Sequence, residues 1–336
     1  MMAALPAWLT LLIAPFIVLN VVIGLVTYVT LLERKFAARM QSRIGPYRVG
    51  PHGLLQPIAD ALKLMMKEDV VPTAADRRIY NLAPIVFLIP CMLIFATIPF
   101  APGLGVADVN IGILFFLAVS AMEIVGLFMA GWGSNNKYAL LSVMRAVNQI
   151  ISYDLPFVFA AFVPVLLAGS LQMSAIVAAQ QGAWFVVVPK WFLFYPVIGQ
   201  LAFVAFLVAT LAAENRVPFD ILEAESELVA GFRVEYSGMK FALIQLGEYA
   251  HMIGSSFLGA LLFLGAWSGP GPEYLGPIWF LLKSMFVFLV VTWIRWSFVR
   301  IRVDQILALS WKALLPATLG LLITTAVVVV WRTSGF

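Results

Sequence analysis

The 336-residue sequence has very few of the side chains that hold redox cofactors or structural metals. It contains one cysteine, Cys91, and two histidines, His52 and His251. A haem group, an iron–sulfur cluster or a zinc site needs more Cys and His ligands than these in a workable arrangement. We therefore expect no metal or redox centre in this chain, and we expect Cys91 to be a small buried hydrophobe.

Charged residues are also scarce. They make up 11% of the chain, whereas a typical soluble domain has about 25%, and 62% of the residues are hydrophobic. This composition indicates a helical protein that crosses a membrane several times and leaves no separate soluble domain. The net charge of +4 is interpreted as a sign of membrane orientation, with no indication of nucleic-acid binding.

The sequence around residues 43–53 lacks the glycine spacing of nucleotide-binding loops. It is rich in Gly and Pro, but neither G-x-G-x-x-G nor G-x-x-x-x-G-K-[ST] occurs there. The segment is expected to be a turn-rich loop.

Long apolar stretches are abundant. A spanning helix needs roughly 20 apolar residues, so we expect an all-α integral membrane protein, one polytopic domain over 1–336. Eight transmembrane helices are predicted at about residues 6–32, 80–99, 111–131, 147–169, 191–213, 241–266, 277–299 and 312–331. Because the first basic residue is Arg34, the first stretch has no positive segment ahead of it and is expected to stay as a helix rather than to be cleaved as a signal peptide.

The distribution of basic residues predicts the orientation. The loops at about 33–79, 132–146, 214–240 and 295–311 together carry 17 of the 21 Lys and Arg. By the positive-inside rule these loops are expected in the cytoplasm and both termini outside.

An amphipathic segment in the first loop, Leu54 to Asp69, predicts a helix that lies in the plane of the membrane interface. Its polar face is either solvated or turned toward a partner or a cavity.

The most unusual stretch is residues 214–240, which holds 6 of the 17 acidic residues between two apolar stretches. Asp220 and Glu223 form a capping-box-like pattern and Gly231 is suited to a helix end, so a short helix is predicted at about 221–230. Its spacing places Glu223 and Glu227 on one face. Like charges so close together imply basic partners, shared protons or good hydration.

Three acidic residues fall inside the predicted spans, namely Glu123, Asp154 and Glu248. Each costs several kcal/mol in a membrane unless it is paired, hydrated or protonated. Counting along the helices from the nearest cytoplasmic charges places Asp154 and Glu248 about 12–14 Å deep, and Glu123 deeper.

Two interpretations of these carboxylates stay open. They form a ladder for protons below the 214–240 loop, or each is a neutral acid that hydrogen-bonds to a neighbouring helix. His251, by itself, is expected to be a satisfied core histidine.

Many segments resemble the quinone-channel membrane subunit of respiratory complex I, the proton-pumping NADH:quinone oxidoreductase. The similarity runs in the family's order from about residue 33 to about residue 316. The segments that carry it are Glu33–Lys35, Arg43–Pro46, Arg48–Pro51, Gly53–Asp60, Ala130–Trp132, Ser134–Leu141, Ile151–Asp154, Asn215–Arg216, Pro218–Asp220, Glu223–Gly231 and Glu235–Lys240.

The resemblance implies a bacterial inner-membrane protein with eight core helices around a tunnel for quinone, the substrate. FMN and iron–sulfur clusters are expected in partner subunits, with no cofactor bound covalently in this chain. The implied partners are the soluble iron–sulfur subunits of the quinone module, antiporter-like membrane subunits and membrane lipid.

Carried over by position, the resemblance assigns two groups of residues. The quinone cavity and its entry comprise Glu33, Arg34, Arg43, Asp60, Lys63, Arg216, Phe219, Asp220, Glu223, Glu225, Glu227, Glu235 and Arg295. The proton path comprises Glu123, Asp154, Glu214 and Glu248, of which Glu123 rests on its position in a span and not on a family match.

The sequence departs from the family pattern at several places. The family usually reads Leu-Ala-Glu-x-Asn-Arg, whereas Leu211-Ala212-Ala213-Glu214-Asn215-Arg216 places the glutamate one residue later, about 100° round a helix. Asp154 replaces a glutamate, and Leu222, Arg233 and His251 stand where Pro, His and Asn are common.

Two other functions compete with this interpretation. One is the homologous subunit of a membrane-bound hydrogenase or a related complex, which uses no quinone. The other is a stand-alone proton-coupled transporter with Asp154 and Glu248 as its coupling site, although we see no internal two-fold repeat of the kind such transporters carry.

Overall fold

The computed structural model describes residues 7–182, 189–222, 225–270 and 272–334. Within these residues the chain forms helices joined by turns and loops, and an isolated β-bridge pairs Ala101 with Leu104. The expected all-α class is therefore confirmed.

The long helices follow the apolar stretches of the sequence. Their bounds are α1 (Ala7–Met40), α3 (Arg77–Leu93), α4 (Gly112–Ala121), α5 (Glu123–Gly133), α6 (Lys137–Ala168), α8 (Ile198–Ala213), α10 (Gly238–Phe263), α11 (Gly276–Ser297) and α13 (Leu315–Thr333). The short ones are α2 (Gln56–Met66), α7 (Met173–Ala179), α9 (Glu225–Leu228) and α12 (Val303–Leu309), with a π-helical turn at Ser310–Leu314 and 3-10 turns at Pro51–Gly53, Ile94–Ala96, Phe192–Phe194, Gly231–Arg233 and Glu273–Leu275.

Six of the described helical segments are long and apolar enough to cross a membrane. They are Ile13–Met40, Arg77–Ala96, Gly112–Gly133, Lys137–Ala168, Gly276–Ser297 and Val303–Thr333. α8 is apolar but has 16 residues, and α10 has 26 residues but includes Lys240, Glu248 and His251. The predicted count of eight spans and the predicted side of the termini therefore stay predictions.

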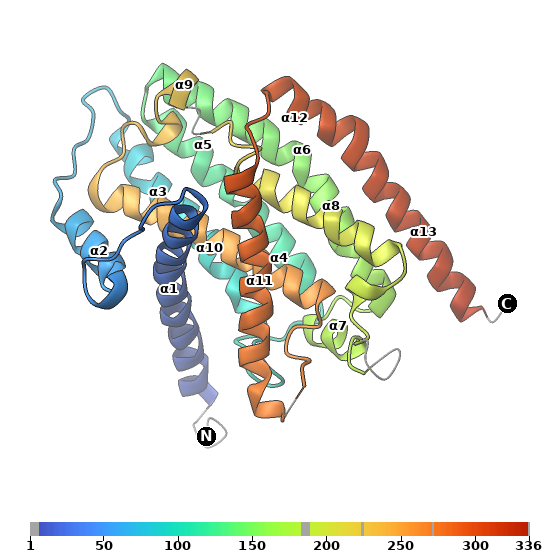
Figure 1. The fold of residues 1–336 in the computed structure, drawn as a ribbon. Helices are drawn as coiled ribbons and strands as arrows, with labels where there is room; N and C mark the ends of the chain where they lie inside the picture. The colour runs from blue at the N-terminus through green and yellow to red at the C-terminus, as the bar shows by residue number, and fades with distance from the viewer. Residues whose placement is uncertain (1–6, 183–188, 223–224, 271, 335–336) are drawn as a thin grey trace.

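The helices differ in their inclination. In Figure 1, α1 and α11 stand upright, whereas α6, α10 and α13 cross the bundle obliquely. The beginnings of α6 and α12 lie with α9 at the top of this view, and α7 and the beginning of α1 lie at the bottom. The loops that join α5 to α6 and α11 to α12 therefore gather with α9 at one end of the bundle, as expected for loops on one side of a membrane.

α10 is the central helix, and small residues let its neighbours approach closely. α3 packs against both α5 and α10, and a Cβ added at Gly126 of α5 would meet the backbone of Phe87. Gly247 and Gly254 of α10 similarly face the side chains of Phe87 and Ile94. Small residues at helix contacts are typical of packing within membranes, and here they bring α3, α5 and α10 together around the polar site.

A buried lysine binds carbonyl oxygens just after the C-terminal end of α10. Lys283 of α11 donates hydrogen bonds to the carbonyl oxygens of Leu264 at 2.6 Å and Ser268 at 2.5 Å, and its Nζ lies 4.2 Å from the centre of the Trp191 ring. A cation at a helix C-terminus satisfies carbonyl groups that lack a partner within the helix. This contact fixes α10 and α11 to each other.

The first half of α1 is only loosely covered by the rest of the chain. Phe16 is 66% exposed, and an apolar groove lies on each side of this half, one of about 310 Å³ toward α10 and α11 and one of about 370 Å³ toward α3. Further along, Val22, Val26 and Val29 are buried, so the helix is held mainly by its second half.

The predicted interfacial helix is present as α2. Leu62, Met65 and Met66 are all more than half exposed along it, and its polar side includes Asp60, which pairs with Arg34 at 2.6 Å. The amphipathic pattern is confirmed, whereas its position in a membrane plane stays a prediction.

The predicted helix at 221–230 is wrong in its extent. The described helical turn is α9, which begins at Glu225 and ends at Leu228. Ile221 and Leu222 are buried instead, and the Ser142 hydroxyl donates a 2.7 Å hydrogen bond to the Leu222 carbonyl. Burial of this apolar pair draws the segment into the bundle, so Asp220 does not begin a helix.

Candidate functional site

Two small polar cavities lie side by side where α5, α8 and α10 meet. Cavity A is lined by Phe87, Glu123, Leu127, Glu214, Asn215, Arg216, Asp220, Leu222, Glu248, His251 and Arg295. Cavity B is lined by Ser120, Glu123, Ile124, Ile150, Asp154, Phe157, Ala213 and His251. The volume in which the centre of a water molecule fits is about 20 Å³ in cavity A and about 10 Å³ in cavity B. Each cavity therefore has room for roughly one water.

Local structure explains how these side chains reach the cavities. Glu248 and His251 are three residues apart on α10, so they project from one face of the helix. α8 ends at Ala213, and the chain then turns, with Asn215 at φ 50°. This turn directs Glu214 and Arg216 into cavity A, while Ala213 faces cavity B.

Glu248 lies between two guanidinium groups. It forms an ion pair with Arg233 and a longer one, at 3.9 Å, with Arg216. The Arg216 guanidinium also lies 4.9 Å from the centre of the Tyr249 ring. The 214–240 loop is thus attached to α10 by ion pairs at the membrane carboxylate.

Glu123 and His251 form a buried pair. His251 Nδ1 lies 3.4 Å from Glu123 Oε2, and His251 and Glu123 are 7% and 8% exposed, respectively. The Cys91 thiol donates to the same carboxylate oxygen over 3.7 Å. Cys91 is buried, as expected. His251 is also buried with a polar partner, as expected of a core histidine, and it lines both cavities.

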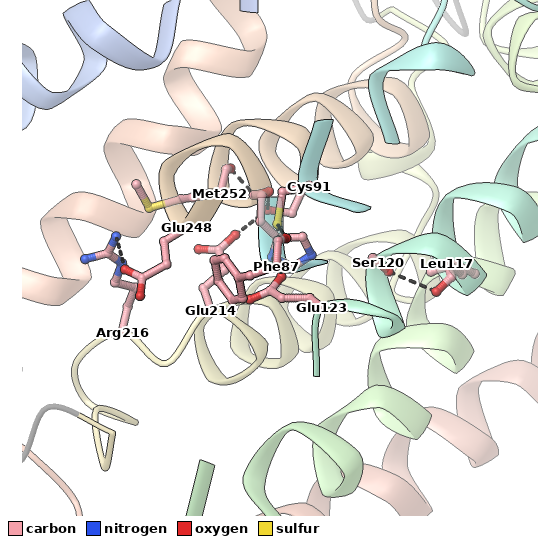
Figure 2. A network of polar contacts seen from close by, with 11 residues as sticks. Phe87, Cys91, Leu117, Ser120, Glu123, Glu214, Arg216, Glu248 and Met252 are labelled. Carbon is pink, nitrogen blue, oxygen red and sulfur yellow. Dashed lines mark hydrogen bonds and ion pairs between the residues drawn. The ribbon is translucent and has the colours of Figure 1, made fainter. Parts of the chain in front are cut away.

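Glu214 lies between Glu248 and Glu123 in Figure 2. It accepts a short hydrogen bond from the Ser255 hydroxyl of α10, while no hydrogen-bond partner for its Oε2 atom occurs among the described residues. The one-residue shift in the sequence therefore does not remove this carboxylate from the site. It places the carboxylate in cavity A.

The remaining membrane carboxylate, Asp154 of α6, belongs to cavity B. The structure thus brings all four residues of the predicted proton path to two adjoining cavities. Glu214 and Glu248 share one cavity with Glu123, and Asp154 shares the other with it, while the predicted order by depth stays a prediction.

The predicted quinone residues are less concentrated. Arg216, Asp220 and Arg295 line cavity A, and Arg295 also pairs with the buried Glu33 of α1. Phe219 is buried, with its ring centre 5.4 Å from that of Tyr153.

Other members of that set lie outside the two cavities. Arg34 and Asp60 pair with each other, and Glu235 accepts a 2.7 Å hydrogen bond from Asn136. Arg43 and Lys63 are exposed. Glu223 and the side chain of Glu225 lie outside the described part of the chain.

Glu227 is on the surface, where it forms a 2.6 Å ion pair with Arg145 of α6. The hydrogen bond from this guanidinium holds the pKa of the Glu227 carboxyl below its ordinary value. Within the 214–240 segment, Glu214 therefore faces inward and Glu227 faces outward.

Sequence reasoning missed two features of the site. It treats His251 alone, although the spacing of three residues from Glu248 is a usable signal that the two side chains share a helix face. It treats Arg233 only as a departure from the family pattern, whereas the structure pairs it with Glu248. Among the described residues, no group of three or more His, Cys, Asp or Glu side chains is placed to hold a metal ion.

Comparisons with known proteins cover nearly the whole chain. Residues 13–326 match the model of a family described as NADH dehydrogenase. A protein of Dehalococcoides mccartyi (strain CBDB1), named as the H subunit of NADH-quinone oxidoreductase, is 47% identical over 320 residues, which are 95% of this chain and 87% of that protein.

Two further relatives carry the same name. That of Geobacillus kaustophilus is 47% identical over 321 residues, covering 94% of this chain and 92% of that protein. That of Brevibacillus brevis is 44% identical over 338 residues, covering 98% of this chain and 97% of that protein.

Proposed function

This chain belongs to the NADH dehydrogenase family, and from that premise we propose that it is the quinone-channel membrane subunit of a proton-pumping NADH:quinone oxidoreductase. One observation carries the proposal. Over more than nine-tenths of its length, the chain is 44–47% identical to proteins named as the H subunit of NADH-quinone oxidoreductase. FMN and iron–sulfur clusters belong, in this proposal, to partner subunits, and quinone is the substrate.

The geometry supports a role for cavity A beside the quinone headgroup. Arg216, Asp220 and Arg295 give it hydrogen-bonding and charged groups. An isoprenoid tail would be held by burial of apolar surface, and the charged loops would guide the headgroup. The loops after α1, α5 and α8 would contact the soluble iron–sulfur subunits.

Coupling to protons is assigned to Glu123, Asp154, Glu214 and Glu248. Reduction of the headgroup changes the charge near Asp220, and the ion pairs of Glu248 with Arg216 and Arg233 link that loop directly to α10. A change in the loop would therefore reach the membrane carboxylates through contacts between charged groups.

Charge removal at the proton path tests this coupling. In the purified complex reconstituted into liposomes, Glu248→Gln and Asp154→Asn are expected to reduce proton translocation by at least about tenfold, somewhat below the usual range for losing a proton-transfer group. The readouts are NADH-driven quinone reduction and the pH gradient. Asp304→Asn is the control, because the Asp304 side chain is 70% exposed and lines neither cavity. Full pumping in the first two variants would contradict the proposal.

Experiments on the same purified complex also distinguish the proposed function from the two rival functions. The names of the relatives include quinone, which favours a quinone-reducing complex over a hydrogenase-type complex. A quinone-site inhibitor is expected to stop electron transfer, and iron–sulfur subunits are expected to co-purify with this chain in mild detergent. A chain that transports protons alone, without such subunits, would support the transporter instead.

A further inference from the structure

The two cavities share only two of their described lining residues, Glu123 and His251. Glu214 and Glu248 line cavity A alone, and Asp154 lines cavity B alone. The Glu123–His251 pair is therefore the part of the described lining that touches both groups of carboxylates.

The pair is built for a buried polar role. Its atoms approach within 3.4 Å, both residues are more than nine-tenths buried, and they come from different helices, α5 and α10. Buried ionisable groups within a membrane protein are costly and are usually functional. Packing alone would be served better by apolar side chains of similar size.

Departures of the sequence from the family pattern meet at this pair. The family's glutamate precedes the x-Asn-Arg segment, at the position of Ala213, and Ala213 lines cavity B. The glutamate of this chain, Glu214, is one residue later and lines cavity A. His251 stands where Asn is common, and Glu123 is assigned by its position in a predicted span, without reliance on a family match. Position 213 thus lies on the same cavity as the Glu123–His251 pair.

We propose that the Glu123–His251 pair carries protons between the two cavities, in place of a carboxylate at position 213. The inference rests on the proposed function and concerns how its proton path is connected. His251 and Glu123 are assigned as proton-transfer residues, and Cys91, which donates to Glu123, as a positioning residue.

The transfer conserves protons at each step. A neutral imidazole accepts a proton from the side of cavity A on one ring nitrogen, which forms the imidazolium. The imidazolium then gives the proton on Nδ1 to the Glu123 carboxylate, which becomes a carboxylic acid. Glu123 releases that proton into cavity B toward Asp154, and rotation or tautomer exchange of the ring restores the starting state.

The test uses the complete complex in liposomes, with NADH-driven quinone reduction and proton translocation measured together. His251→Asn and Glu123→Gln are each expected to lower proton translocation by about tenfold or more, as for loss of a general acid–base group. Ser256→Ala is the matched control. Ser256 is a buried residue of α10 whose hydroxyl donates to the Met252 carbonyl at 2.7 Å, and it lines neither cavity.

A rescue experiment separates proton transfer from a merely structural role. Ala213→Glu, added to His251→Asn, returns a carboxylate to cavity B, and the smaller carboxamide at 251 leaves room for it. At least half of the lost translocation is expected to return. Ala213→Gln in the same background fills the same space without a titratable group, so it should not restore translocation if the carboxylate itself is needed.

The results distinguish failure of this inference from failure of the proposed function. A wild-type complex that does not reduce quinone overturns the proposed function. A wild-type complex that reduces quinone and pumps protons, together with unchanged pumping in His251→Asn and Glu123→Gln, overturns the assignment of the pair. Absence of rescue by Ala213→Glu overturns the claim that the pair replaces a carboxylate at that position.

Discussion

At the scale of single residues, the ion pairs of the 214–240 segment serve two different environments. Arg233 and Glu248 are 11% and 16% exposed in their side chains, whereas Arg145 and Glu227 are 35% and 56% exposed. Breaking a buried pair by removing one partner typically costs about 3–5 kcal/mol, and an exposed pair contributes little. The less exposed pair, Arg233–Glu248, therefore holds the loop to α10. The more exposed pair, Arg145–Glu227, can be broken at little cost in stability.

The Arg145–Glu227 pair is expected to respond to acid. Because the pKa of Glu227 is lowered in the folded protein, its contribution to stability is present at neutral pH and is lost as the pH falls through that lowered value. Protonation removes the attraction to Arg145. The protection factors of amides in α9, which correct for the slower intrinsic exchange in acid, should therefore fall on acidification more than those in α10.

Glu227→Gln is the matched variant for this pH experiment. The substitution removes the charge at every pH, so α9 should exchange faster at neutral pH and lose its extra response to acid. An acid response in Glu227→Gln equal to that of the wild type would assign the effect to another group.

At the scale of helices, the close approach of α3 and α5 depends on Gly126. A Cβ at this position would meet the backbone of Phe87, which cannot move aside as a flexible side chain can. Gly126→Ala is therefore expected to destabilise the protein by about 1–3 kcal/mol, the usual range for overpacking. The loss should appear as a lower thermal unfolding midpoint in detergent.

Gly320 of α13 provides the comparison for this substitution. A Cβ at Gly320 has no described heavy atom within 4 Å, and alanine is the better helix former. Gly320→Ala should leave the unfolding midpoint unchanged or raise it slightly. Equal losses in the two variants would show that the cost comes from the helix and not from the contact with α3.

The helices were more predictable from sequence than the site. Apolar stretches of sufficient length mark α3, α6, α11 and α13 because burial in hydrocarbon requires that pattern. Depth counted along each helix from its cytoplasmic charges treats every helix as upright. α6 and α10 cross the bundle obliquely (Figure 1). A depth count also does not say which helix faces are adjacent, so it does not predict that Asp154 and Glu248 line different cavities.

Short-range rules also failed where long-range packing decides the conformation. Asp220 and Glu223 have helix-capping spacing, but the buried Ile221 and Leu222 hold that segment inside the bundle. The identity of a partner across the bundle, such as His251 for Glu123, depends on which helix faces are adjacent, and hydrophobic periodicity does not encode it.

At the scale of the whole molecule, the orientation predicted from basic residues leads to a labelling experiment. The single cysteine is buried, so a membrane-impermeant maleimide should not react with the folded wild-type chain. Val299→Cys, at a position that is 83% exposed and lies in a predicted cytoplasmic loop, should react in inside-out vesicles.

Ala107→Cys is the reciprocal variant. Ala107 is exposed between α3 and α4, a connection predicted to lie outside, so it should react in right-side-out vesicles. The opposite pattern at both positions would reverse the orientation, and reaction of both from one side would contradict an odd number of crossings between them.

The loose cover on the first half of α1 connects this protein to the lipid composition of its membrane. In a bilayer, the two apolar grooves beside that half would take up acyl chains, whereas Glu33 near the other end of α1 pairs with Arg295. A helix with one free half adjusts its tilt to bilayer thickness. Acyl-chain length would thus act, through the lean of α1, on the ion pair at the edge of cavity A.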